Sequence, residues 1–282
     1  TDLMLICSSV SPVSLGGIDR AADDLRELGE RAARRGLRIG YEALAWGRHV
    51  SDHRDAWEIV RRADHSNVGL ILDSFHTLAR KTDVSTIRAI PKDKIFFVQL
   101  ADAPAIDMDL LYWSRHYRNM PGEGDLPVTD FMRAVAATGY DGYLSLEIFN
   151  DQFRGGSPHS VAVDGHRSLV WLMDEVRREE PALAVELPPM PGPVGVEGVA
   201  FVEFATDEAG AAGIGRMLAT MGLAEAGRHV SKNVALWRQG GINLVINTER
   251  EGFAHSSYLV HGANAYAIGL KVEDARATVE RA

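Results

Sequence analysis

Four oxygen-bearing side chains stand at the ends of four short apolar segments, spaced at about the length of one strand-and-helix unit. They are Glu42, Asp73, Gln99 and Glu147, separated by 31, 26 and 48 residues, whereas one such unit takes about 30 residues. Carboxylate and amide oxygens are hard ligands, so their convergence predicts a site for Mg²⁺, Mn²⁺ or Co²⁺ rather than for a softer metal. Without a cation, three neighbouring carboxylates would repel one another and one of them would stay protonated.

A second interpretation makes each of these residues the N-cap of the helix that follows its strand. Asp and Ser favour that position, because their side chains accept a hydrogen bond from the first turn of the helix. Glu is not a favoured cap, and two of the four residues are Glu42 and Glu147. We therefore favour a metal site over four unrelated caps.

Two further polar residues follow the same strand ends. His76 lies three residues after Asp73, at the start of the next predicted helix. It is a candidate general base or a donor to the substrate, with an ordinary polar loop residue as the alternative. Asp102 lies three residues after Gln99. It either orients a metal ligand through a hydrogen bond or caps the next helix, and the sequence leaves both options open.

A long loop at residues 103–125 contains the remaining candidates. Arg118 precedes the run Pro121-Gly122-Glu123-Gly124, and its guanidinium is suited to a substrate carboxylate. Ser114 is a weaker candidate for the same task, as is His116. The alternative is a solvated loop with scattered charges.

Parallel strands of one sheet are needed to bring the four strand-end side chains together. The alternation of apolar and amphipathic segments in residues 1–178 predicts an α/β fold, specifically a (β/α)₈ barrel, whose functional residues lie at the carboxyl ends of the strands. The predicted strands are Leu3–Ser8, Leu37–Glu42, Val68–Asp73, Ile95–Leu100 and Tyr143–Phe149, and the predicted helices are Ile18–Arg35, His53–Ala63, Val84–Ile90, Val128–Ala137 and His166–Arg178. Five strands do not close a barrel of eight, so we expect three more before Thr1; an open five-stranded sheet is the literal alternative.

A proline-rich segment at residues 179–196 predicts a linker, and a second domain follows at residues 197–282. There the pattern changes to an α+β order of β-α-β-β-β followed by β-α, for which we expect an antiparallel sheet. The predicted elements are the strands Val199–Phe204, Ala226–His229, Val234–Arg238, Ile242–Asn247 and Ala265–Leu270 and the helices Glu208–Met221 and Glu273–Arg281.

The composition of the chain indicates which classes of binding partner to expect. The net charge of −9 argues against a nucleic-acid surface and against an anionic membrane. No apolar run approaches the roughly 20 residues of a membrane span. The single cysteine, Cys7, forms no disulfide framework, which favours a reducing, cytoplasmic location, and its apolar neighbours predict that it is buried. We expect a small-molecule substrate, with a homo-oligomer as an open option.

The strand-end motifs resemble a known superfamily. A strand-end Glu, Asp-x-x-His, Gln-x-x-Asp, a Pro-Gly-Glu-Gly loop and a final strand-end Glu resemble the xylose isomerase-like sugar phosphate isomerases and epimerases. Segments 41–50, 72–76, 96–104 and 144–151 are similar, more closely, to bacterial 3-dehydroshikimate dehydratases. Gln99, in place of the superfamily's more usual His, narrows the match. These dehydratases fuse the barrel to a domain like 4-hydroxyphenylpyruvate dioxygenase, which segments 227–240 and 253–256 resemble, and this implies a vicinal-oxygen-chelate-like βαβββ domain.

The resemblance implies a metal-dependent lyase that converts 3-dehydroshikimate to protocatechuate with loss of water. It implies that Glu42, Asp73, Gln99 and Glu147 bind the metal, and that His76 removes a C–H proton. Arg118 and Ser114 would hold the substrate carboxylate or hydroxyls. The alternative is a metal-dependent sugar phosphate or hydroxypyruvate isomerase, with the second domain a non-catalytic assembly or ligand-binding module. We assign no metal to residues 196–282.

Overall fold

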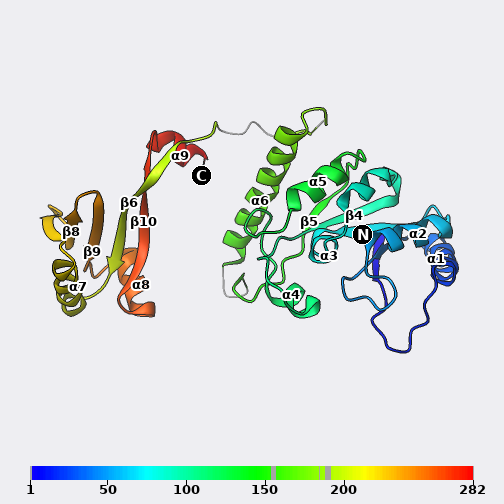
Figure 1. The fold of residues 1–282 in the computed structure, drawn as a ribbon, viewed down its shortest axis with the longest axis horizontal. Coiled ribbons are helices and arrows are strands. Elements are labelled where there is room, and N and C mark those ends of the chain that lie inside the picture. The colour runs from blue at the N-terminus through cyan, green and yellow to red at the C-terminus, as the bar shows by residue number, and fades with distance from the viewer. Residues whose placement is uncertain (1, 154–156, 184, 188–191, 282) are drawn as a thin grey trace. The chain divides into compact units, whose positions relative to one another are not determined.

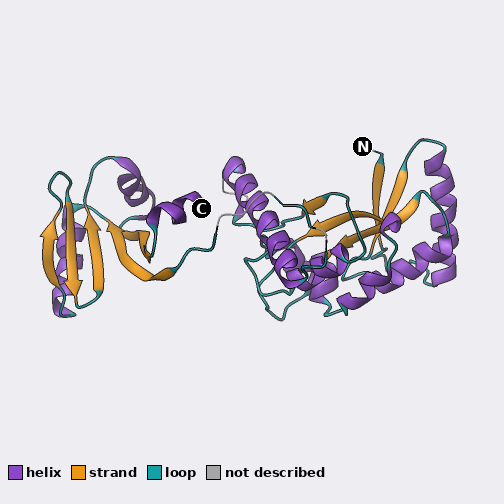
Figure 2. Cartoon of the chain, turned by 90° about the horizontal axis from the view of Figure 1, so that it is seen from above, coloured by secondary structure: helices purple, strands orange, loops and turns teal. Residues whose placement is uncertain are grey.

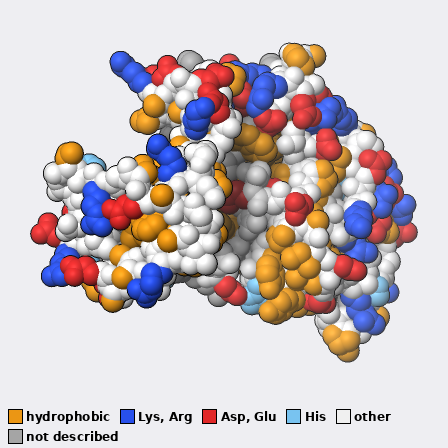
Figure 3. Space-filling view, turned by 60° about the vertical axis from the view of Figure 1, so that its left-hand side comes forward, with side chains coloured by type: hydrophobic (Ala, Val, Ile, Leu, Met, Phe, Trp, Pro, Cys, Tyr) orange, Lys and Arg blue, Asp and Glu red, His pale blue; other side chains and the backbone are white. Residues whose placement is uncertain are grey.

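The computed structural model describes residues 2–153, 157–183, 185–187 and 192–281. The chain divides into two compact units, Thr1–Pro188 and Pro189–Ala282, and this division falls inside the predicted proline-rich linker. Figures 1 and 2 show the helices and strands of each unit. Lys and Arg side chains are interspersed with Asp and Glu over the face shown in Figure 3.

The first unit is built on five parallel strands that lie side by side in sequence order. They are β1 (Leu3–Cys7), β2 (Arg38–Glu42), β3 (Val68–Asp73), β4 (Ile95–Leu100) and β5 (Leu144–Leu146). All six residues of β3 are buried, as expected for an apolar strand with layers on both faces. The predicted parallel arrangement is confirmed, although β5 is shorter than the run Tyr143–Phe149.

Helices connect these strands. They are α1 (Ile18–Ala33), α2 (His53–Ala63), α3 (Ser74–Ala79), α4 (Leu110–His116), α5 (Val128–Ala136) and α6 (Pro158–Glu179), with the 3₁₀ segments η1 (Val84–Ala89) and η2 (Lys92–Lys94). In Figure 1, α1 packs beside α2 and α5 packs beside α6. In α2, one helical face is apolar and buried, and this face packs against the rest of the unit. Its residues are Ala56, Ile59, Val60 and Ala63. The side chain of Asp52 caps this helix by accepting the N–H of Arg54.

Three local predictions in this unit were wrong. Val84–Ala89 is a 3₁₀ segment rather than an α-helix. α6 begins at Pro158, well before the predicted start at His166, because proline fits the first helical turn. The predicted loop contains α4, in which Asp109 accepts the N–H of Tyr112 as the N-cap.

Cys7 is exposed, which contradicts its predicted burial. It lies on β1, whose described partner in the sheet is β2 alone. Its Sγ donates to Oε2 of Glu42 at 3.4 Å. An apolar sequence context therefore did not ensure burial, because neighbours must cover both sides of a strand.

The second unit contains one five-stranded sheet, in the order β10-β6-β9-β8-β7. Its elements are β6 (Val196–Ala205), α7 (Glu208–Thr220), β7 (Ala224–Arg228), β8 (Val234–Gln239), β9 (Ile242–Asn247), α8 (Gly252–His261), β10 (Asn264–Val272) and α9 (Ala275–Arg281). Leu218 of α7 packs with Leu223 and Ile246 in the core of this unit. α7 lies against one face of the sheet in Figure 2.

The expectation of an antiparallel sheet was wrong. β6 and β9 are parallel neighbours, whereas the other adjacent strands are antiparallel. The sheet is mixed because β6 runs parallel to β9 on one side and antiparallel to β10 on the other. In sequence, α7, β7 and β8 separate β6 from β9. α8 was also missed; it connects β9 to β10. Among the described residues, no helix is both long and apolar enough to cross a membrane.

Candidate metal centre

The register of the parallel sheet places the four strand-end residues on one face. Glu42 is aligned with Ile71, two residues before Asp73, and Asp73 is aligned with Gln99. Gln99 is aligned with Ser145, two residues before Glu147. Side chains two apart on a strand point to the same face, and aligned residues of neighbouring strands share a face. The sheet therefore brings all four side chains together.

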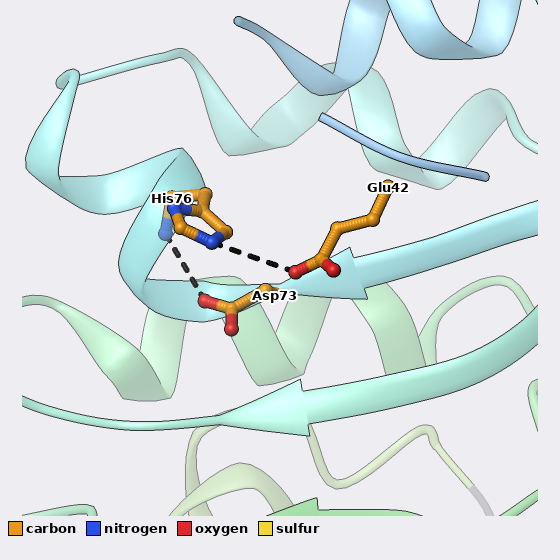
Figure 4. A group of neighbouring side chains, drawn as sticks. All are labelled: Glu42, Asp73 and His76. Atoms are coloured by element: carbon orange, nitrogen blue, oxygen red, sulfur yellow. Dashed lines mark hydrogen bonds and ion pairs between the residues drawn. The ribbon is translucent and has the colours of Figure 1, made fainter. Parts of the chain in front are cut away.

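Glu42, Asp73 and His76 form the tightest part of this cluster (Figure 4). All three are buried, and each offers a ligand atom within 4.8 Å of the others, a group that could hold a metal ion. Nε2 of His76 lies 3.5 Å from Oε1 of Glu42. The backbone N–H of His76 donates to Oδ1 of Asp73 at 3.1 Å. Asp73 is thus also the N-cap of α3, whereas neither Glu42 nor Gln99 nor Glu147 caps any described helix.

Gln99 and Glu147 extend the cluster along the sheet. Nε2 of Gln99 donates to Oε1 of Glu147 at 2.8 Å. Two oxygens of the cluster, Oε1 of Glu42 and Oε1 of Gln99, are buried with no hydrogen-bond partner. An unsatisfied buried acceptor costs about 1–3 kcal/mol, so such atoms are uncommon and call for a partner. A hard cation is the kind of partner that these oxygens fit.

Arg118 is buried in the same cluster, with 1% of its surface exposed. Its Nη1 donates to Oδ2 of Asp73 and to Oε2 of Glu147, both at 2.8 Å. Its Nε and Nη2 donate to Oγ of Ser114, at 3.1 and 2.9 Å. The rings of Phe75 and Phe149 lie 4.7 and 5.4 Å from the guanidinium carbon. The solvated-loop interpretation of Arg118 and Ser114 was therefore wrong.

The charges in this cluster do not balance without a further cation. Burial, and then the charges of Asp73 and Glu147, raise the pKa of Glu42 to about 8. Burial, and then the charge of Asp73, raise the pKa of Glu147 to about 7. Burial also opposes ionisation of Asp73, but Arg118 and His76 outweigh it and hold that pKa below its ordinary value. Near pH 7 the site therefore holds protons in place of a cation; ionisation of all three carboxylates beside one guanidinium would give a net charge of −2, which a divalent ion would neutralise.

Burial lowers the pKa of His76 to about 4, so its ring is neutral near pH 7. The backbone N–H of Ala45 donates to Nδ1 at 3.1 Å. In a neutral imidazole with Nδ1 as the acceptor, the proton is on Nε2. His76 therefore presents an N–H toward Glu42 and the centre of the cluster.

A model described as "Xylose isomerase-like TIM barrel" matches residues 2–172, which is more than half of the chain. The chain belongs to the xylose isomerase-like TIM barrel family. A second model, for "Hydroxyphenylpyruvate dioxygenase, HPPD, N-terminal", matches residues 190–282.

Several relatives are similar to the chain over both of its units. A 3-dehydroshikimate dehydratase of Pseudomonas putida is 50% identical over 290 aligned residues, which cover 100% of the chain and 45% of the relative. One of Pseudomonas aeruginosa is 52% identical, with coverages of 100% and 45%. A solved "xylose isomerase-like TIM barrel/4-hydroxyphenylpyruvate dioxygenase fusion protein" superposes with a TM-score of 0.81 at 50% identity, over 99% of the chain and 46% of that protein. The chain spans about half the length of the curated relatives it matches. The resemblance and the fold class inferred from the sequence are confirmed.

The role of Asp102 within this barrel was left open by the sequence. Its carboxylate accepts the N–H groups of four residues of the following loop, Ala103, Gly122, Gly124 and Leu126. It caps no described helix. Asn150 was not selected in the sequence analysis, and its Nδ2 donates to the carbonyl oxygen of Arg118 at 3.1 Å. Its position three residues after Glu147 is the one signal that would have pointed to it.

We expect the metal-free protein to become less stable as the pH rises from 6.5 to 8.5. In the unfolded chain Glu42 and Glu147 lose their protons near 4.5, but in the folded chain near 8 and 7. Within that window the folded state binds more protons, so raising the pH favours unfolding by up to about 1.4 kcal/mol per pH unit for each carboxyl. His76 acts with the opposite sign only below pH 6.5. Urea unfolding across the window measures the slope, and saturating Mn²⁺ should abolish or reverse it; a flat metal-free curve contradicts the expectation.

Replacing Gln99 by methionine tests whether its orphaned oxygen is a ligand. The side chains have similar volume, but methionine offers no hard oxygen. If Oε1 of Gln99 binds the metal, the dissociation constant for Mn²⁺ should rise at least about tenfold. If it does not, metal affinity should be unchanged within about twofold, and any loss of stability would reflect the lost hydrogen bond from Nε2 of Gln99 to Glu147. Calorimetric titration together with urea unfolding separates the two outcomes.

Proposed function

We propose that this chain carries the catalytic centre of a metal-dependent 3-dehydroshikimate dehydratase that forms protocatechuate. The observation that carries the proposal is the set of strand-end side chains, in which three carboxylates face one guanidinium and two buried oxygens have no hydrogen-bond partner. Its substrate class is supported by 3-dehydroshikimate dehydratases that are 50% and 52% identical across the whole chain. The reaction removes one proton from carbon and one hydroxyl group, which leave as water, and the ring then becomes aromatic.

Glu42, Asp73, Gln99 and Glu147 would hold a divalent ion, for which Mg²⁺, Mn²⁺ and Co²⁺ are the candidates. Such an ion acts as a Lewis acid that polarises a carbonyl oxygen and makes the adjacent C–H more acidic. Asp73 and Glu147 are held in place for this task by Nη1 of Arg118. Their orientation is thus set before any metal binds.

For His76 we favour the donor role over the general-base role. The Ala45 N–H occupies the lone pair of Nδ1, which leaves the proton on Nε2. To accept a proton at Nε2, the ring would have to change tautomer and lose that hydrogen bond. His76 would instead donate from Nε2 to a substrate oxygen, as a neutral imidazole can do in a buried site.

Arg118 and Ser114 retain a narrower role in substrate binding. Ser114 is committed to the guanidinium through two hydrogen bonds. Nη2 of Arg118 lies 3.4 Å from Nε2 of His76, where both nitrogens carry hydrogen, so the second N–H of Nη2 finds no acceptor among the described side chains. This N–H and that of His76 lie side by side and would together bind one substrate oxygen.

For the second unit we propose a non-catalytic role in assembly or ligand binding. Its match to the N-terminal part of hydroxyphenylpyruvate dioxygenase supports a related fold. His229 is exposed and contacts Ser231, as suits a surface residue. We also propose a cytoplasmic location and leave a homo-oligomer open.

The natural protein that contains this chain tests the function directly. Incubation with 3-dehydroshikimate and Mg²⁺ or Mn²⁺ should produce the ultraviolet absorbance of a catechol, and a chelator should abolish it. The exposed control Glu58→Gln, on the outer face of α2, should retain full turnover. If 3-dehydroshikimate is not consumed by the metal-loaded protein, the proposal is wrong.

A further inference from the structure

Asp102 holds an unusual number of backbone donors. It is 2% exposed and lies just beyond the end of β4. Its Oδ1 accepts the N–H groups of Ala103 and Leu126, at 2.8 and 3.0 Å. Its Oδ2 accepts those of Gly122 and Gly124, both at 3.1 Å. Three of these four donors lie at least 20 residues away in sequence, so one carboxylate determines the path of the loop back to the sheet.

The same residue is bonded to the segment that carries Arg118. The backbone N–H of Asp102 donates to the carbonyl of Asn119 at 2.9 Å, and the N–H of Asn119 donates back at 2.8 Å. On the other side of this segment, Asn150 binds the carbonyl of Arg118, and the N–H of Arg118 donates to the carbonyl of Phe149. The backbone of Arg118 is therefore fixed between the continuations of β4 and β5.

This fixation matters because the guanidinium has little freedom. One nitrogen, Nη1, donates to Asp73 and Glu147 at the same time, each at 2.8 Å. Hydrogen bonds weaken steeply beyond a few tenths of an ångström or outside a limited range of angles. A displacement of about 1 Å in a catalytic group can cost about 100-fold in rate. A shift of the loop would therefore be transmitted to two of the proposed metal ligands.

We propose that Asp102 is a positioning residue: by accepting four N–H groups of residues 103–126, it sets where Arg118 meets Asp73 and Glu147. Its effect on turnover rests on the proposed function, whereas its effect on metal binding does not. Asp102 itself touches neither the proposed ligands nor the N–H groups that face the substrate position. It acts through Arg118.

The decisive experiment is a double-mutant cycle in the natural full-length protein, combining Asp102→Asn with Arg118→Met. An amide offers one acceptor oxygen, and its NH₂ group would face two backbone donors. Asp102→Asn alone should lower kcat about 10–100-fold, which is the usual effect of removing a residue that orients the groups around a metal site. It should also shift the Mn²⁺ dissociation constant in the same direction as Arg118→Met. In the Arg118→Met background, Asp102→Asn should change both quantities by less than about twofold.

A second variant disturbs the same contact without altering Asp102. A Cβ added at Gly124 would lie 2.4 Å from Oδ1 of Asp102 and 2.6 Å from the nitrogen of Ala103. Gly124→Ala must therefore push the loop away from the carboxylate, and it should reproduce the effects of Asp102→Asn. The control is Asp52→Ala, which removes the cap of α2. It should lower the unfolding temperature and leave kcat and the Mn²⁺ dissociation constant within about twofold.

Equal effects of Asp102→Asn in the presence and absence of Arg118 would overturn the proposal and leave Asp102 as a general stabiliser of the loop. Normal kcat and metal affinity in both Asp102→Asn and Gly124→Ala would overturn it as well. If the unaltered protein forms no product, the dehydratase function fails. The cycle measured on Mn²⁺ affinity still decides the role of Asp102 in that case.

Discussion

Arg118→Met is expected to destabilise the metal-free protein by about 3–5 kcal/mol, the usual cost of removing one partner from a buried ion pair. Arg118 and Asp73 are both buried, and the same guanidinium also neutralises Glu147. Methionine preserves much of the packing between Phe75 and Phe149 but leaves the two carboxylates without their cation. Saturating Mn²⁺ should restore a large part of the lost stability, because the ion replaces the missing positive charge.

Turnover of this variant should stay at least about 100-fold below that of the unaltered protein even with metal, since the substrate-facing N–H of Nη2 is gone. The variant should bind Mn²⁺ more tightly than the unaltered protein, because a competing cation has been removed. The control is Arg61→Met on α2, whose ion pair with Glu58 lies at the surface and should contribute about 1 kcal/mol or less. Urea unfolding with and without metal provides the comparison. A stability loss as small as that of the control would contradict the structural account of Arg118.

Glu42→Gln is expected to have opposite effects on stability and on function. The carboxyl of Glu42 is buried, its Oε1 has no hydrogen-bond partner, and its pKa is raised to about 8. Removing this charge should stabilise the metal-free protein at pH 8.5, where the folded carboxyl is ionised at a cost. It should also weaken Mn²⁺ binding and turnover by at least about 100-fold, since the amide is a poorer ligand and reduces the negative charge of the site. Such a trade-off is characteristic of functional sites rather than of structural ones.

Three measurements examine this expectation together: urea unfolding without metal at pH 8.5, calorimetric titration with Mn²⁺, and catechol formation. Glu58→Gln provides the matched control, because its carboxylate forms exposed ion pairs with Arg61 and Arg62 and should leave all three unchanged within about twofold or 0.5 kcal/mol. A Glu42→Gln protein that binds Mn²⁺ normally would remove Glu42 from the proposed ligand set. A loss of stability would show that its charge is compensated in the metal-free state.

The sequence by itself determined the layout of the first unit and the convergence of the strand-end residues. Apolar runs at regular spacing specify parallel strands, and parallel strands place their carboxyl ends at one edge. Glu42, Asp73, Gln99 and Glu147 could therefore be grouped without knowing any side-chain contact, because each of them ends a predicted parallel strand. The residues of the strand-end motifs also resemble the family to which the chain belongs. Apolar periodicity and short motifs are local properties of the chain, so they can be recognised in the sequence without the tertiary structure.

The tertiary structure alone decided where Arg118 lies and what it does. Its segment leaves β4 and returns through a loop whose path depends on bonds from Asp102 to residues up to 24 positions away. No periodicity encodes such contacts, so a buried guanidinium between Asp73 and Glu147 looked from the sequence like a loop cation. The same limit explains Cys7, whose exposure depends on which strands flank β1, and the mixed sheet of the second unit, where β6 pairs with the distant β9. Each of these features depends on contacts between residues far apart in the chain, which are settled only when the whole fold forms.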